Sequence, residues 1–137
     1  MSTRSRIGIK RKDGSVESIY CHWDGYLEYN GKVLLENYKD INKINELLDL
    51  GNISSLGSTI DSTNAYMRDR GETGQEKKAH KDLAEFNAYM YDTWEEFVYL
   101  YDEQNEEWKY SIIPYPFTSG SLLFEKLTKK AINYYKD

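Results

Sequence analysis

Apolar and polar residues alternate in two short runs near the start of the chain. Residues 6–11 alternate around Ile7 and Ile9, and residues 16–23 alternate in the same way, which is the two-residue period of a β-strand. Between the runs lies Asp13-Gly14, and Asp-Gly is the strongest short-range signal for a tight hairpin turn. The pattern therefore predicts an N-terminal β-hairpin.

The chain then changes to the spacing of an amphipathic helix. Apolar residues recur every three or four positions at Leu34, Leu35, Tyr38, Ile41, Ile44, Leu47 and Leu48. Asp40 can cap the second of two helices, and Gly51 stands where a left-handed residue is expected to end it. Residues 52–57 form a tight connection. The polar residues 58–78 are expected to form a mobile loop with one short strand near 65–68.

The second half of the chain predicts a helix, a hairpin and a final helix. The helix covers about 76–90, and residues 97–101 and 108–112 form strands on either side of an acidic turn. A helix through 94–101 is the alternative. The last helix begins near Ser121, with a stripe of Leu123, Leu127, Ala131 and Tyr134. Together these elements predict a single α+β domain over residues 1–137, with an antiparallel sheet built from both hairpins and packed with three to four helices.

Length and composition agree with one domain and add three expectations. A chain of 137 residues can bury one core, and its single cysteine, Cys21, allows no internal disulfide. The N-terminus has no apolar signal segment, and no apolar run approaches the roughly 20 residues of a membrane span, so we expect a cytoplasmic protein that does not enter membranes. Thirteen tyrosines are typical of half-buried surfaces and interfaces, although AT-rich codon usage also raises tyrosine content.

Residues that could carry catalysis or bind a metal are sparse. Cys21 and His22 are neighbours on a predicted strand and point to opposite faces, so they cannot act as nucleophile and base together. His80 is the only other histidine, and no zinc-ligand spacing, phosphate-binding loop or nucleophile elbow is present. We therefore expect no metal, no cofactor and no enzymatic activity.

Charge is distributed in blocks, although the net charge is only −5. Residues 82–107 carry nine carboxylates and no Lys or Arg, with aromatic residues among them. Such a block can resemble the phosphate track of a nucleic acid and occupy a basic channel of another protein, whereas the same charge disfavours direct binding to DNA or RNA. A solvated face is the alternative. The predicted partner-binding residues are Asp92, Glu95, Glu96, Tyr99, Tyr101, Asp102, Glu103, Glu106, Glu107 and Trp108.

A second candidate site combines aromatic and arginine side chains. Trp23 and Tyr26 can stack on a base beside Asp24, and Arg68 and Arg70 can hold a phosphate. In the alternative reading Asp24 closes a strand, and the arginines pair with acids in their own loop.

Several segments resemble a family of small proteins encoded by tailed bacteriophages and prophages. The matching segments are Arg6-Ile-Gly-Ile, Asp13-Gly-Ser-Val, Ile19-Tyr-Cys-His-Trp-Asp-Gly-Tyr26, Leu34-Leu-Glu-Asn-Tyr38, Asn52-Ile-Ser-Ser-Leu-Gly57, Arg68-Asp-Arg-Gly-Glu72 and a late Tyr99-Leu before a tryptophan. The match is strong over 6–57, patchy to about 110 and absent beyond. This chain departs from the family at residues 27–30, where the usual turn contains proline, and in its C-terminal helix.

The resemblance implies an accessory phage protein made in the bacterial cytoplasm. Small phage proteins without enzymatic motifs often antagonise host defence, and acidic ones resemble anti-CRISPR proteins that imitate nucleic acid. We therefore expect a non-enzymatic inhibitor that binds a host effector, such as a CRISPR–Cas nuclease. The alternatives are a protein that sequesters a nucleotide immune signal and a structural or regulatory phage protein.

Overall fold

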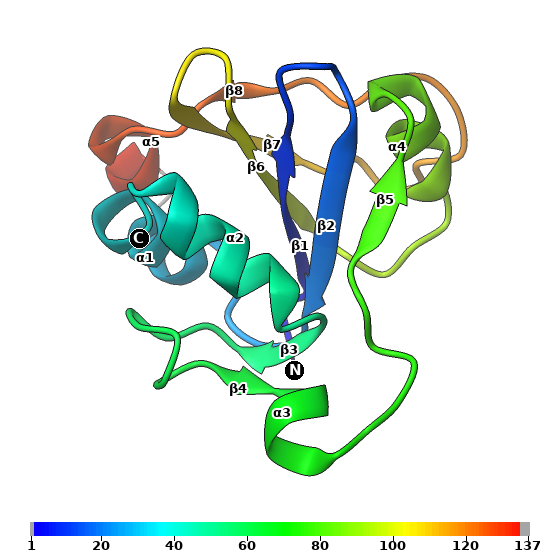
Figure 1. The fold of residues 1–137 in the computed structure, drawn as a ribbon. Coiled ribbons are helices and arrows are strands. Elements are labelled where there is room, and N and C mark those ends of the chain that lie inside the picture. Colours follow the sequence, from blue (N-terminus) through cyan, green and yellow to red (C-terminus); the bar gives the residue numbers. More distant parts are fainter. Residues whose placement is uncertain (1, 135–137) are drawn as a thin grey trace.

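The computed structural model describes residues 2–134 and places one β-sheet between helices (Figure 1). The strands are β1 (Ser5–Lys10), β2 (Val16–Cys21), β3 (Ile53–Ser55), β4 (Asn64–Ala65), β5 (Lys78–His80), β6 (Phe97–Asp102), β7 (Glu107–Ile112) and β8 (Glu125–Lys126). The helices are η1 (Leu27–Gly31), α1 (Lys32–Asn37), α2 (Ile41–Asp49), α3 (Tyr66–Arg70), α4 (Leu83–Tyr89) and α5 (Lys129–Tyr134). The predicted single α+β domain is confirmed.

The sheet is mixed, which corrects the prediction of an antiparallel sheet. Its strand order is β4-β3-β2-β1-β6-β7-β8, and β5 pairs with β2 beside β3. Both predicted hairpins, β1–β2 and β6–β7, are present and antiparallel. They join through a parallel pairing of β1 with β6, and β2 also runs parallel to β3. Parallel neighbours need a long crossover, and the helices between the hairpins supply it.

Each face of the sheet covers its own apolar cluster. On the first face Ile7, Ile9 and Ile19 pack against buried residues of α1 and α2. On the second face Val98 and Leu100 pack against Phe86 and other residues of α4 and the segment that follows β7. Strand alternation separates the two sets, because successive side chains point to opposite faces.

The turn and the helix ends predicted for the first half of the chain are present. The Asp13 carboxylate accepts hydrogen bonds from the Ser15 backbone amide at 2.9 Å and from its hydroxyl at 2.7 Å, which closes the turn. Asp40 caps α2 by accepting from the Asn42 amide at 2.8 Å. Gly51 has a φ of +78°, the left-handed conformation expected at the end of α2.

Two expectations about the middle of the chain were wrong. Residues 58–78 contain β4, α3 and the start of β5, so the segment has more secondary structure than predicted, and the strand expected near 65–68 is largely the helix α3. The helix predicted over 76–90 begins only at Leu83, where Asp82 caps it by accepting from the Glu85 amide. Its predicted first turns are instead β5, because residues 78–80 complete their backbone hydrogen bonding by pairing with β2.

The C-terminal helix is shorter than predicted. It begins at Lys129, not near Ser121, and the two-residue strand β8 pairs with β7 ahead of it. Leu123 and Leu127 both precede the helix, so the predicted stripe does not form there; Leu127 is buried, whereas Leu123 is 84% exposed. The Tyr134 side chain lies outside the described residues. No helix within the described part of the chain is long and apolar enough to cross a membrane.

Candidate functional site

Three aromatic residues predicted to bind a partner belong to the core. Tyr99, Tyr101 and Trp108 are buried because they lie on the inward side of the β6–β7 hairpin. The Tyr99 hydroxyl donates to the Gly25 carbonyl at 2.7 Å, and the Trp108 indole donates to the Tyr38 carbonyl at 2.8 Å. These side chains hold the fold together and offer no surface to a partner.

The acidic residues of the second hairpin are largely neutralised within the molecule. Asp102 is 6% exposed and pairs with Lys109 at 3.1 Å, and Glu107 pairs with Lys126 at 3.7 Å. Burial opposes ionisation of Asp102, but hydrogen bonds from Asn105 and Lys109 outweigh it and lower the pKa of the carboxyl. The hairpin turn therefore lacks the uncompensated acidic field predicted for it.

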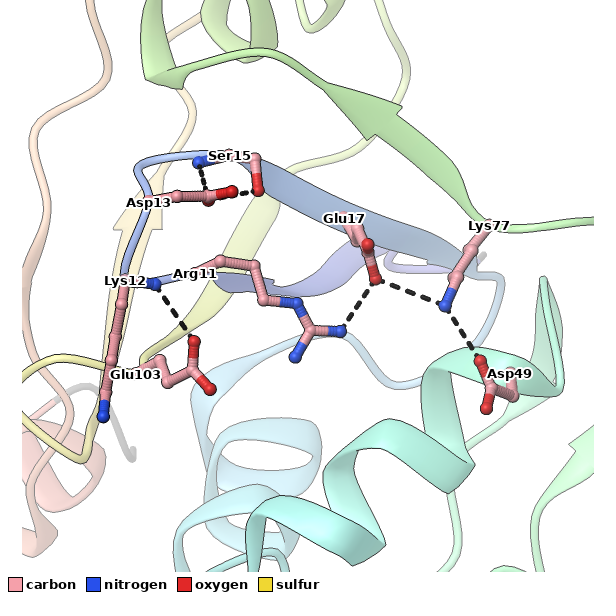
Figure 2. Close-up of polar contacts among 8 residues, drawn as sticks. All are labelled: Arg11, Lys12, Asp13, Ser15, Glu17, Asp49, Lys77 and Glu103. Atoms are coloured by element: carbon pink, nitrogen blue, oxygen red, sulfur yellow. Dashed lines mark hydrogen bonds and ion pairs between the residues drawn. The ribbon is translucent and has the colours of Figure 1, made fainter.

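Glu103 also has a partner, and it connects the two hairpins (Figure 2). Its carboxylate accepts from the Lys12 backbone amide at 3.0 Å. Beside it, Glu17 pairs with Arg11 at 2.9 Å and with Lys77 at 3.2 Å. Burial raises the pKa of Glu17, but the hydrogen bonds and charges of Arg11 and Lys77 lower it by more. The pKa of Glu17 is therefore below its usual value. This end of the sheet is charged and internally paired.

Glu95 has a structural role instead of the predicted binding role. It is 8% exposed, and its carboxylate accepts from Arg6 Nε at 3.1 Å. The same guanidinium donates to the Ser18 hydroxyl at 3.1 Å and lies 5.1 Å from the centre of the Tyr89 ring. Of the ten predicted residues, only Asp92, Glu96 and Glu106 are exposed.

The second predicted site is not assembled as expected. The Arg68 guanidinium donates hydrogen bonds to the Asp69 carboxylate and to the backbone carbonyls of Ile60 and Thr63. The Arg68 hydrogen bond lowers the pKa of Asp69 to about 2. Arg70 lies 5.1 Å over the Tyr66 ring. The Tyr26 hydroxyl donates to Asp24 at 3.3 Å, so these two residues do contact each other.

The sheet topology brings three separate segments to one end of the molecule. β1 and β6 begin at this end, and their antiparallel partners β2 and β7 finish there. Backbone hydrogen bonds then join the segments that continue beyond the strands. Gly25 donates to the Thr3 carbonyl at 2.8 Å, Glu96 to the Arg4 carbonyl at 2.8 Å, and Ile113 to the Glu96 carbonyl at 2.9 Å.

Exposed aromatic residues gather at this end, which we call the aromatic end. Tyr115 is 96% exposed and Trp94 is 77% exposed, and they lie on segments that this hydrogen bonding places side by side. Trp23, at 44%, and Tyr29, at 40%, extend from the segment after β2. Large apolar groups exposed together on a folded domain commonly mark an interaction surface.

A groove of about 630 Å³ runs through the aromatic end. Its walls come from residues 92–97 and 112–117, with Ser2 and Arg4 at the N-terminal side. Phe97, Ile112 and Phe117 make the lining apolar, and Trp94 and Tyr115 stand beside it. Asp92 and Glu96 are exposed acids on the same groove, so its border has acidic as well as aromatic character.

Cys21, the cysteine of the chain, does not line the groove. Cys21 is fully buried beside Asn30, and burial raises the pKa of its thiol to about 11, so the thiolate is scarce at neutral pH. Over the described side chains, no cluster of three or more His, Cys, Asp or Glu residues is placed to hold a metal ion. The arrangement is suited to binding an apolar or basic surface.

Sequence reasoning missed the two most exposed aromatic residues of this site. Tyr115 lies between Pro114 and Pro116, and Trp94 precedes a strand; neither belongs to an alternating or helical stripe, which was the available signal. No protein-family model, curated protein or solved structure matches the chain.

Proposed function

We propose that this protein acts by binding another protein through its aromatic end, without catalysis. The observation that carries the proposal is the joint exposure of Trp94 and Tyr115 beside an apolar groove. Trp and Tyr are enriched among the residues that dominate binding energy at interfaces. In the free protein the apolar surfaces of these two side chains are in water, and a partner that covers them would gain the free energy of burying them.

The border of the groove favours a partner with a basic surface. Asp92 and Glu96 are exposed there, whereas the third acid, Glu95, is neutralised by Arg6. Arg4 is the cation on the groove lining, so the partner must tolerate one positive charge. The proposed binding surface is thus acidic and aromatic, as the sequence predicted, but it lies at the end of the sheet opposite the hairpin turn at Glu106.

The biological setting follows from the resemblance to small phage proteins. In that setting the partner is a component of a bacterial antiphage system, and a CRISPR–Cas effector with its basic nucleic-acid channel is the first candidate. The protein would then inhibit the effector by occupying its surface.

A plating assay tests both the setting and the site. Hosts that each carry one defined antiphage system, with CRISPR–Cas systems included, would express the protein and be challenged with a phage that the system restricts. We expect restored plaque formation in one host and at least a tenfold loss of that rescue for the Trp94→Ala/Tyr115→Ala variant, because hot-spot aromatics contribute about 2 kcal/mol or more each.

Leu123→Ala supplies the matched control, because Leu123 is 84% exposed and does not line the groove. It should rescue plating as the parent protein does. Failure to rescue in any host would remove the anti-defence role. Rescue that survives the double substitution would instead reject the aromatic end as the binding surface.

A further inference from the structure

A second surface forms where the end of β2 meets α3. It consists of Arg4, Tyr20, His22, Tyr66 and Arg70, and we call it the arginine–tyrosine patch. Tyr20 and His22 are two apart at the end of β2, so they point to one face, and the Tyr20 hydroxyl is 2.8 Å from His22 Nδ1. Arg6 lies opposite Tyr20 in the register of β1 and β2. Arg4 is two positions before Arg6, so along an extended chain it points to the same side.

Asn52 brings α3 against these residues. Its side-chain oxygen accepts from the Tyr20 amide at 2.9 Å, and its backbone carbonyl accepts from the Tyr66 amide at 3.3 Å. The backbone amides of the two tyrosines therefore both donate to Asn52, although 46 positions separate them in the chain. Arg70 then lies over the Tyr66 ring at 5.1 Å. Sheet pairing and one asparagine thus assemble a surface from distant segments.

The arginines of the patch differ from most others in the molecule. Arg6, Arg11 and Arg68 each pair with a carboxylate. Among the described residues, neither Arg4 nor Arg70 has a carboxylate within ion-pair distance. Arg70 lies over the Tyr66 ring, and Arg4 acts on the Tyr20 hydroxyl.

Contact with an aromatic ring orients a guanidinium without neutralising its charge. A guanidinium held against a ring keeps in-plane N–H donors for a bidentate oxyanion partner. Burial raises the pKa of Tyr20, and Arg4, within hydrogen-bonding reach of the hydroxyl, partly lowers it. The Tyr20 ring is half-buried, so it gives a fixed platform.

We propose that the arginine–tyrosine patch binds a nucleotide. Arg4 and Arg70 hold the phosphate oxygens, and the tyrosine and histidine rings contact the base. The patch shares Arg4 with the protein-binding groove, whereas Arg70, Tyr20, His22 and Tyr66 do not line that groove. A phosphorylated protein segment would meet the guanidiniums but would leave the rings without a base.

Isothermal titration with three probes tests the proposal: ATP, inorganic pyrophosphate and adenosine. We expect ATP to bind and the other two to bind at least about tenfold more weakly, because each supplies only part of the contact. The chemical shifts of His22 should also move with ATP, because its ring hydrogen-bonds Tyr20 in the patch.

Arg70→Gln and its neighbour Arg68→Gln make a matched pair, because both are exposed on α3 and both substitutions remove one positive charge. Arg70→Gln should weaken ATP binding at least about tenfold, the value of a lost charged hydrogen bond, and Arg68→Gln should change it less than twofold. Unfolding curves of both variants establish that they are folded. Absence of ATP binding, equal binding of ATP and pyrophosphate, or equal losses for the two variants would each overturn the proposal.

Discussion

The buried Arg6–Glu95 pair allows a sharp test of the structure, because it connects β1 to the segment before β6. The side chains are 5% and 7% exposed, and Nε and Oε1 are 3.1 Å apart. Glu95→Ala would leave the guanidinium buried with the Ser18 hydroxyl as its remaining hydrogen-bond partner. Arginine does not lose its proton at ordinary pH, so the buried positive charge would remain without a carboxylate partner.

The expected loss of unfolding free energy is large. Breaking a buried pair by removing one partner costs about 3–5 kcal/mol, because the remaining charge is uncompensated. Domains are stable by about 5–15 kcal/mol in total, so the variant should lose a substantial fraction of its stability. For a chain of this length, the midpoint of thermal unfolding should fall by about 10–15 °C.

Urea unfolding followed by tryptophan fluorescence measures the change. Glu96→Ala is the neighbouring control, since Glu96 is exposed, and it should change stability by less than about 0.5 kcal/mol. Arg6→Met/Glu95→Leu should recover most of the loss, because an apolar pair removes both buried charges. A loss below about 1 kcal/mol for Glu95→Ala would mean that the pair behaves as a solvent-exposed one, and the burial argument would be refuted.

Two further predictions concern pH and thiol reactivity. Glu17 and Asp102 have lowered pKa values in the folded state, so their contribution to stability is complete above their unfolded values of 4.5 and 3.8 and is lost as the pH falls through the lower folded values. Burial also lowers the pKa of His80, so a separate loss of stability begins below its unfolded value of 6.5. Urea unfolding between pH 7 and pH 3 should therefore show a further decline below pH 4.5 that is smaller in Glu17→Gln, and an equal decline in that variant would contradict the assignment. Cys21, buried with a thiol pKa of about 11, should react with a disulfide reagent at pH 8 only as fast as the protein opens, and a native rate equal to that in urea would contradict its placement.

Local signals in the sequence predicted much of the fold. Asp13-Gly14 marked the first hairpin, and Asp40 marked the start of α2. These signals depend only on residues adjacent in the chain, so they can be read from a single sequence. The segment 78–80 shows the opposite case: its helical pattern is overridden by strand pairing with β2, a partner about 60 positions away.

The candidate site could be predicted only in part for the same reason. Alternation within the β6–β7 hairpin did not say which side would be inward, and the inward side took Tyr99 and Trp108 from the predicted surface. The partner of Glu95 lies 89 positions away, so the acidic block looked uncompensated along the chain. Asp92 and Glu96 are exposed, as a binding role requires, but their neighbours at the groove arrive through the pairing of β6 with β1 and with β7.

The two ends of the sheet differ in a way that favours one of them as the binding surface. At the hairpin turns, charged groups have found partners in the molecule, such as Glu17 with Lys77 and Glu103 with the Lys12 amide (Figure 2). At the aromatic end, Trp94 and Tyr115 have large apolar surfaces that the fold leaves in water. An exposed ring adds little to folding stability, since stability grows with the apolar area removed from water. These side chains, which topology gathers at a groove, are the basis on which we propose this end as the binding surface.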